Sequence, residues 1–448
     1  MRSIGRTALA AMMAAGALPA TAQQPQNDAL ARLQRTQAAN PSSVAANRAL
    51  GIWYYKANRY AEARVPLDMA HKLDPRDGVS ALYDGLAAEQ LKDYAAARAA
   101  YNDYLTVGKT RGARNEIRAR LVVVTQEELK AGAAAAVANE AQLAQQAPVP
   151  NTVAVLPFRF SGTDASLQPL ERGMADLVVT DLSKSHLLRV LERDRAQAMT
   201  DEIALSRTGQ VDAATAVRAG KLMQAERLVQ GAIVQTGGRN INLTSAVLST
   251  QTSAQVGQAD QQGDLEQIFA VEKAFVMKVF TALGVALTPA ERQEVDRRST
   301  QSLAAFLAYS RGLQAQDAGR FDEAAGFFDN ARSLDPGFGA ALQRAQSNSA
   351  AQQSSTARVE SGIRGSSEGA IAVAAERGAT TTTTTTGLGV TLNTVIGDVN
   401  PTTTNTVTNN TGGSSSAAPA TRDPAAEKTG GDLPNVRIGS VTIIIKRP

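Results

Sequence analysis

The sequence of 448 residues contains no cysteine, only two histidines, and aromatic residues at 4%. The absence of cysteine excludes structural disulfides, thiolate metal sites, cysteine nucleophiles and a lipid attached to an N-terminal cysteine. Alanine, glutamine and threonine are abundant, whereas the bulky residues of a large core are scarce. This composition favours alanine-rich helices and low-complexity tracts over a large compact enzyme.

Charge is almost balanced, and chemically reactive patterns are missing. Lys and Arg together number 46 against 42 Asp and Glu, a net charge of +4 without a basic cluster, so no nucleic-acid partner is expected. We interpret His71 and His186 as surface or boundary residues of different domains rather than as a metal or catalytic pair. Neither a phosphate-binding loop nor a nucleophile elbow is present. No cofactor, metal, catalytic residue or small-molecule substrate is therefore expected.

Residues 1–22 have the pattern of a signal peptide. Two arginines precede a short apolar stretch that ends in a small-x-small site, which predicts cleavage between Ala22 and Gln23. The alternative is a membrane anchor, but the apolar run is shorter than the roughly 20 residues that a spanning helix needs. We expect a periplasmic or outer-membrane-associated protein that contacts the membrane only indirectly. The glutamine-rich residues 23–43 are interpreted as a flexible lead-in.

A period of 34 residues is the clearest internal repetition. It relates Gly51 to Gly85, Tyr60 to Tyr94 and Ala63 to Ala97. Small residues at these positions allow two antiparallel helices to approach closely, and the tyrosines fill the space between them. The same offsets recur far along the chain, at Gly312, Phe321, Ala324 and Phe328. The pattern resembles the tetratricopeptide-repeat superfamily.

This resemblance organises the helical parts of the chain. We predict two repeats over residues 44–107, a long connecting helix over 108–145 that is broken near Gly132, and a helix with a third repeat over 288–345. In the resembled superfamily the first helix of each hairpin lines a concave groove that binds a protein segment. Carried over position by position, the groove residues here are Arg48, Ile52, Tyr55, Lys56, Leu86, Glu89 and Gln90. The alternative is that the two hairpins only pack on the long helix and present no groove.

Residues 150–286 change to the pattern of an α/β domain. Apolar and alternating runs predict the order β-α-β-α-α-β-β-β-α, a mixed sheet covered by helices, with Gly237-Gly238 as a hairpin turn. Glu192 and Arg193 are interpreted as residues that shape a strand-to-helix junction, for example as an ion pair, in preference to a charged site. Asp194 is interpreted as the helix N-cap. Thr288 and Glu291 predict a capping box after the domain.

Several segments of this domain, taken in order, resemble the curli production assembly/transport component (CsgG) family. They are Val153 to Phe158, Leu191-Glu192-Arg193, Gly209 and Asp212, Gly220-Lys221-Leu222 and Ala225 to Ile233. The resemblance implies an envelope location and an oligomer-prone domain, and in the channel members a secretion pore. This chain departs from those channel subunits because it has no cysteine for the lipid that anchors them.

The C-terminal part is rich in threonine, asparagine, glycine and serine. Such a tract buries too little apolar area to offset the entropy of ordering, so residues 346–434 are predicted to be disordered. Residues 435–446 instead have strong β-propensity. We predict that they add as an edge strand to a sheet of the same chain or of another; the alternative is a disordered end.

The fold predicted for the whole chain is α+β multidomain, with helical hairpins, one mixed-sheet domain and a disordered tail. We interpret the chain as an exported adaptor or assembly factor of the cell envelope, without enzymatic activity. Its repeats would bind envelope proteins, and its α/β domain would associate with itself or with an envelope complex. The alternative is a curli-type outer-membrane secretion-channel subunit, and a remote alternative is a hydrolase.

Overall fold

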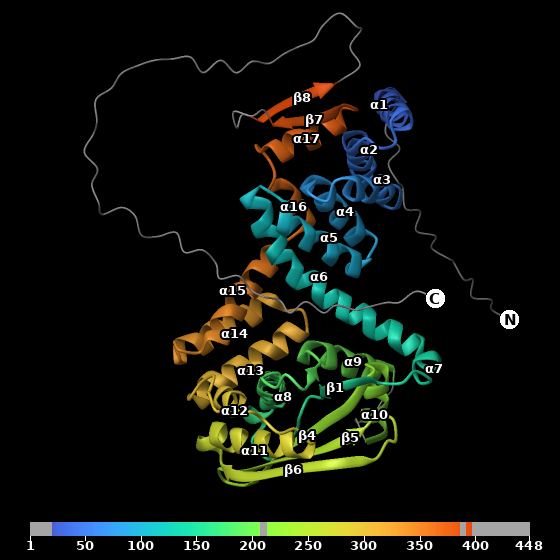
Figure 1. Ribbon diagram of the computed structural model, residues 1–448. Coiled ribbons are helices and arrows are strands. Elements are labelled where there is room, and N and C mark those ends of the chain that lie inside the picture. Colours follow the sequence, from blue (N-terminus) through green and yellow to red (C-terminus); the bar gives the residue numbers. More distant parts are fainter. Residues whose placement is uncertain (1–19, 207–212, 386–390, 397–448) are drawn as a thin grey trace, which may run out of the picture. The chain divides into compact units, whose positions relative to one another are not determined.

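The computed structural model describes residues 20–206, 213–385 and 391–396. Its N-terminal part is helical (Figure 1): α1 (Ala20–Ala39), α2 (Val44–Lys56), α3 (Tyr60–Leu73), α4 (Gly78–Gln90), α5 (Tyr94–Val107), α6 (Arg111–Ala138) and α7 (Glu140–Leu143). The predicted cleavage site, Ala22–Gln23, falls in the first turn of α1, and most of the predicted signal peptide lies outside the described residues.

The lead-in is not flexible as predicted, because α1 occupies most of it. Leu33 is buried in the core of the hairpins, and the Gln34 amide donates to the Tyr54 hydroxyl at 3.0 Å. The glutamine-rich composition concealed an apolar face, since Ala29 and Leu30 pack against the same core as Leu33.

Close helix packing in the hairpins depends on the predicted small residues. A side chain at Gly51 would collide with Leu67, and one at Gly85 would lie 2.6 Å from the Tyr101 ring. Ala63 and Ala97 are completely buried between the paired helices. The helical hairpins predicted over residues 44–107 are therefore confirmed.

The long helix α6 corrects one detail of the prediction. It runs without a break through Gly132, where the surroundings are open, and ends at Ala138. A helix tolerates a solvent-exposed glycine at a cost of about 1 kcal/mol, which is too little to break it.

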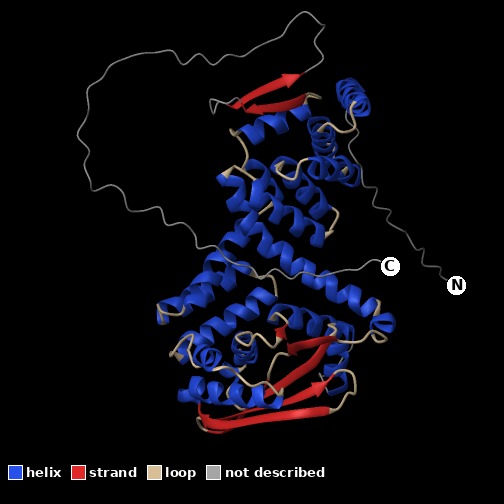
Figure 2. Cartoon of the chain, viewed as in Figure 1, coloured by secondary structure: helices blue, strands red, loops and turns tan. Residues whose placement is uncertain are grey.

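The α/β domain has the predicted element order with one short strand added. Figure 2 shows its strands with helices packed against them. Its strands are β1 (Val149–Val155), β2 (Arg159–Ser161), β3 (Arg189–Val190), β4 (Ala225–Gly237), β5 (Asn240–Ser249) and β6 (Gln255–Asp264). Its helices are α8 (Leu170–Leu182), α9 (Arg193–Ser206), α10 (Ala213–Leu222) and α11 (Ile268–Ala282), with short 3₁₀ turns η1 (Ala165–Leu167) and η2 (Leu265–Gln267).

Strand order in the sheet is β3-β1-β4-β5-β6, and β2 pairs with β4. The strands β1, β2 and β3 make parallel pairs, whereas β4, β5 and β6 form an antiparallel meander. Gly237 and Gly238 both have positive φ, as the predicted tight turn between β4 and β5 requires. The mixed sheet is confirmed.

Alternate residues of β1 enter two different cores. Val153 and Val155 pack with α8 and α11 on one face, while Ala154 and Leu156 pack with α9 and α10 on the other. Both faces of the sheet are thus covered at β1, which explains why residues 153–156 are continuously apolar.

A second helical region follows the domain: α12 (Pro289–Val295), α13 (Leu303–Asp317), α14 (Phe321–Leu334), α15 (Gly339–Gln353), α16 (Thr356–Ser361) and α17 (Ser367–Glu376). The strands β7 (Thr380–Thr385) and β8 (Thr391–Ile396) form a separate hairpin. The capping box at Thr288 and Glu291 is present as predicted. The prediction of disorder over residues 346–434 is wrong for the end of α15, for α16 and α17, and for β7 and β8, which all lie in that range. The predicted strand over residues 435–446 lies outside the described residues.

Phe328 holds the hairpin of α13 and α14 in the domain core. It is fully buried, its ring centroid lies 5.3 Å from that of Tyr309, and a side chain at Gly312 would come within 2.5 Å of its ring. We expect Phe328→Ala to lower the free energy of unfolding by about 3–5 kcal/mol, the usual cost of deleting a buried ring. The neighbouring, partly exposed Phe327 provides the control for urea denaturation. An equal loss in Phe327→Ala would contradict the packing described.

Candidate functional site

The predicted groove residues do come together, but they do not line an open groove. Ile52 and Leu86 are fully buried, and Arg48, Tyr55 and Glu89 are less than a tenth exposed. The covering elements come from the same chain: α17 packs on α2, and α16 packs on α6. Apolar residues of this C-terminal segment join the hairpin core, namely Val359, Ile363, Ile371, Ala372 and Ala375.

Polar contacts hold the covering segment at the predicted groove positions. Lys56 forms ion pairs with Glu360 and Glu376, the latter at 2.8 Å. The Gln90 amide donates to the Thr356 hydroxyl at 3.3 Å. Glu89 turns inward instead, where it accepts from the Tyr101 hydroxyl at 2.8 Å and pairs with Arg120. The chain therefore fills its own helical concavity.

Glu368 of α17 is the central polar contact of this closure. Its buried carboxylate accepts hydrogen bonds from the Tyr104 hydroxyl at 2.7 Å, the Lys109 amide at 3.0 Å and the Thr110 amide at 3.2 Å. The Thr110 hydroxyl donates to it as well. Thr110 is the N-cap of α6, so Glu368 places a negative charge at the positive end of that helix.

Removing the Glu368 carboxylate leaves the buried Tyr104 hydroxyl and the partly buried donors of Lys109 and Thr110 unsatisfied. We expect Glu368→Ala to lower the free energy of unfolding by about 3 kcal/mol, because each stranded buried donor costs roughly 1–3 kcal/mol. Glu376→Ala, on the same helix, removes only a partly exposed ion pair and should cost less than about 1 kcal/mol. Urea denaturation compares the two. Equal effects would mean that α17 does not seal the hairpins.

A second buried polar cluster joins the α/β domain to the third hairpin. The Arg193 side chain is only 3% exposed and makes a bidentate contact with Asp317 of α13, at 2.6 and 2.9 Å. Asp194 pairs with it too, and Asp176 of α8 lies 3.6 Å from its Nε. Burial alone would lower the pKa of the Arg193 guanidinium, but Asp194 and Asp317 raise it well above its ordinary value. Arg193 therefore remains a cation.

This cluster corrects the interpretation of the junction at Glu192. Arg193 pairs with aspartates rather than with Glu192, and it is the first residue of α9, so Asp194 lies in the first turn instead of capping the helix. Burial, followed by the charge of Asp194, raises the pKa of Glu192. The main partner, Asp317, is 124 residues away in the sequence, where no local pattern points to it.

Two neighbouring carboxylates inside the domain, Glu272 and Asp181, were not expected from the sequence. Glu272 of α11 is 1% exposed, and its carboxyl oxygens have no hydrogen-bond partner among the described residues. Lys273 lies 3.5 Å from Glu272 but only 2.5 Å from Asp181 of α8. Burial, and then the charge of Asp181, raises the pKa of Glu272 well above its ordinary value.

Glu272 should make the stability of the domain depend on pH. A carboxyl group whose pKa is raised on folding stabilises the fold below its unfolded pKa, and this contribution is lost as pH rises towards the folded value. We expect Glu272→Gln to be more stable than the parent protein at neutral pH and to lose this part of the pH dependence. Urea denaturation from pH 4 to pH 8 measures the difference. The exposed Glu266→Gln is the control, and a parent-like pH profile for Glu272→Gln would refute the assignment.

The two histidines occupy separate positions. The Nε2 atom of His71 lies 3.5 Å from Asp103, and Nδ1 of the exposed His186 lies 2.7 Å from Glu291 of the capping box. Within residues 20–206, 213–385 and 391–396, no three His, Asp or Glu side chains are grouped as a metal site would require. In the same residues no helix is both long and apolar enough to cross a membrane.

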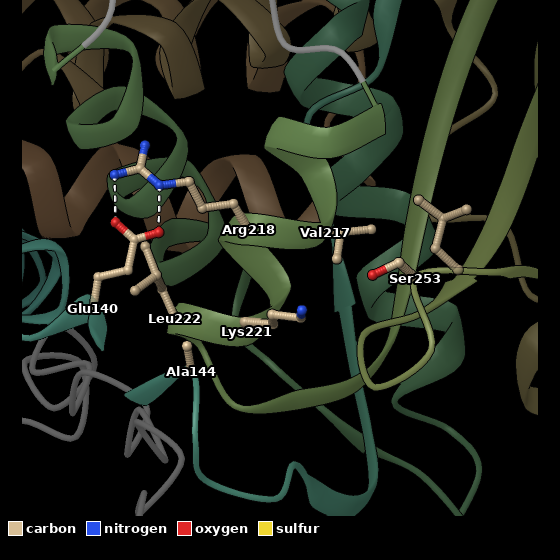
Figure 3. Close-up of a pocket in the computed structure, with 8 residues that line it drawn as sticks. Glu140, Ala144, Val217, Arg218, Lys221, Leu222 and Ser253 are labelled. Atoms are coloured by element: carbon tan, nitrogen blue, oxygen red, sulfur yellow. Dashed lines mark hydrogen bonds and ion pairs between the residues drawn. The ribbon is translucent and has the colours of Figure 1, made fainter. Parts of the chain in front are cut away.

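A pocket of about 560 Å³ opens on the α/β domain (Figure 3). It is formed by the end of α7, one face of α10, and β5 with the turn that follows it. Its lining residues are Glu140, Ala144, Val217, Arg218, Lys221, Leu222, Leu248 and Ser253. No local pattern groups these residues, because they come from three distant segments.

The outer face of α3 carries exposed apolar side chains. Val65 is 73% exposed, and Met69 and Leu73 follow it at one-turn intervals. A cavity of about 380 Å³ beside them reaches Pro41, Leu50 and Tyr54.

Comparison with known proteins finds a similarity that covers most of the α/β domain. None of the curated proteins matches this chain. A family model does match residues 134–257, a span that runs from the end of α6 to the start of β6 and contains the whole pocket lining. Over this span the chain is similar to the family described as Curli production assembly/transport component CsgG.

Proposed function

We propose that this chain is an exported assembly component of the cell envelope. Its α/β domain would associate with itself or with an envelope complex, and no enzymatic step is involved. The similarity of residues 134–257 to the curli production assembly/transport component is the observation that carries the proposal. A mixed sheet of the predicted topology supports it.

An adaptor role for the helical hairpins has to be reconciled with the covering of their predicted groove by helices of the same chain. We regard these hairpins, as the sequence pattern suggests, as tetratricopeptide-type repeats. Their concave face is covered by α16 and α17, so a partner would have to displace these helices or bind elsewhere. The exposed apolar residues Val65, Met69 and Leu73 on α3 favour contact with a protein segment of mixed apolar and polar character.

The alternative is an outer-membrane secretion-channel subunit of the curli type. The same family similarity favours it, because that family's description includes transport as well as assembly. The absence of cysteine favours the adaptor, since a lipid cannot be attached through a thioether.

Cell fractionation separates the two roles. For an adaptor we expect the mature protein, starting near Gln23, in the periplasm or in an envelope fraction that carbonate releases. Carbonate-resistant association with the outer membrane would support the channel subunit instead. Retention of Met1 on cytoplasmic protein would contradict both. Affinity capture from solubilised envelopes would then identify the partners.

A further inference from the structure

The pocket of Figure 3 has the size and construction of a ligand site. Its volume of about 560 Å³ lies within the range of roughly 300–1,000 Å³ that is usual for small-ligand pockets. Three secondary-structure elements build it: α7 with the residue that follows it, the last turns of α10, and β5 with its turn. Both α7 and α10 pack against the core that contains Leu222 and Leu248, so the pocket walls are held in place by that core.

The charges in the pocket do not cancel. Arg218 binds Glu140 through Nε at 2.7 Å and through Nη2 at 2.8 Å. Its third nitrogen, Nη1, is buried and has no hydrogen-bond partner among the described residues. Lys221 lies one helical turn further and pairs with no carboxylate in the described part of the chain. The pocket lining therefore carries two cations, Arg218 and Lys221, and one carboxylate, Glu140. This leaves a net positive charge that an anion could neutralise.

The remaining wall is apolar. Val217, Leu222 and Leu248 are buried side chains whose surfaces close the pocket, and Ala144 lies at its edge. Figure 3 shows Lys221 extending below Val217 towards the turn that carries Ser253, whose hydroxyl faces the same space. A cation and a hydroxyl beside an aliphatic wall match a ligand with an anionic head and a hydrocarbon body.

We propose that this pocket binds an aliphatic carboxylate. The carboxylate would lie at the Lys221 ammonium, within reach of the Ser253 hydroxyl, and the hydrocarbon would lie against Val217, Leu222 and Leu248. Two sources offer this chemistry: a free fatty acid, and the C-terminus of a peptide that ends in an aliphatic residue. The site goes beyond the proposed envelope role and is tested on the purified chain alone, so the two can fail separately.

Calorimetric titration of the purified full chain tests the proposal. The probes are octanoate, octylamine, and a short peptide ending in leucine with either a free or an amidated C-terminus. We expect saturable binding of octanoate, of the free-acid peptide, or of both, and no binding of octylamine or of the amidated peptide. Octanoate alone would identify a fatty-acid site, and the free-acid peptide alone would identify a peptide C-terminus site.

Two variants locate the binding in this pocket. Lys221→Gln should weaken binding about tenfold or more, because it removes a charge-assisted contact. Lys278→Gln, which removes an exposed lysine of the same domain, should leave binding unchanged. Ala144→Trp places a large side chain at the pocket edge without changing its charge and should abolish binding. Octylamine binding as well as octanoate, unchanged binding in both pocket variants, or no saturable binding of either carboxylate would overturn the proposal.

Discussion

The buried guanidinium of Arg193 fixes how the α/β domain is joined to the helices that follow it. A cation removed from water costs several kcal/mol unless carboxylates surround it. Here Asp317 supplies a bidentate contact from α13, and Asp176 approaches from α8. Asp176 in turn accepts from the Tyr309 hydroxyl at 2.8 Å and pairs with Arg344 of α15 at 3.2 Å. None of these helices can shift without stranding a buried charge.

Glu368 joins distant segments in the same way at the N-terminal hairpins. Here a C-terminal helix, α17, is fixed to the N-terminal part of the chain. The segment after α15 returns to α2 and α6, and Glu368 joins residues more than 250 positions apart by hydrogen bonds at Lys109 and Thr110. Apolar residues of the C-terminal segment therefore share one core with the hairpins. The covering helices stabilise the hairpins. If the hairpins act as an adaptor, a partner that uses the same face has to compete with these helices.

Local patterns in the sequence were sufficient for the helical hairpins and for the α/β domain, but they missed α1, α16 and α17. They were also insufficient for the contacts between distant segments. The spacing of Gly51 and Gly85 predicted the hairpins because close helix packing imposes small residues at fixed intervals. Apolar periodicity predicted the order of the α/β domain. By contrast, the pairing of Arg193 with Asp317 depends on a fold that brings them together, and composition hid Val359 and Ile363 within a serine-rich stretch. The pocket around Lys221 was missed for the same reason, since its three segments meet only in the folded chain.

The covered faces of the sheet limit how the domain could assemble as proposed. Helices of the domain and of its flanking regions cover both faces of the sheet at β1, and the part left exposed at β6 is mostly polar, so the sheet offers little apolar surface to a second copy. At one end of the sheet β6 pairs only with β5 within the described residues. Its sequence is dominated by glutamine, glycine and aspartate, which suppresses nonspecific pairing yet leaves main-chain groups free to pair with a matching strand. An assembly built from this domain would therefore be held by strand pairing at a polar edge and by its helical surface, rather than by apolar stacking of sheets.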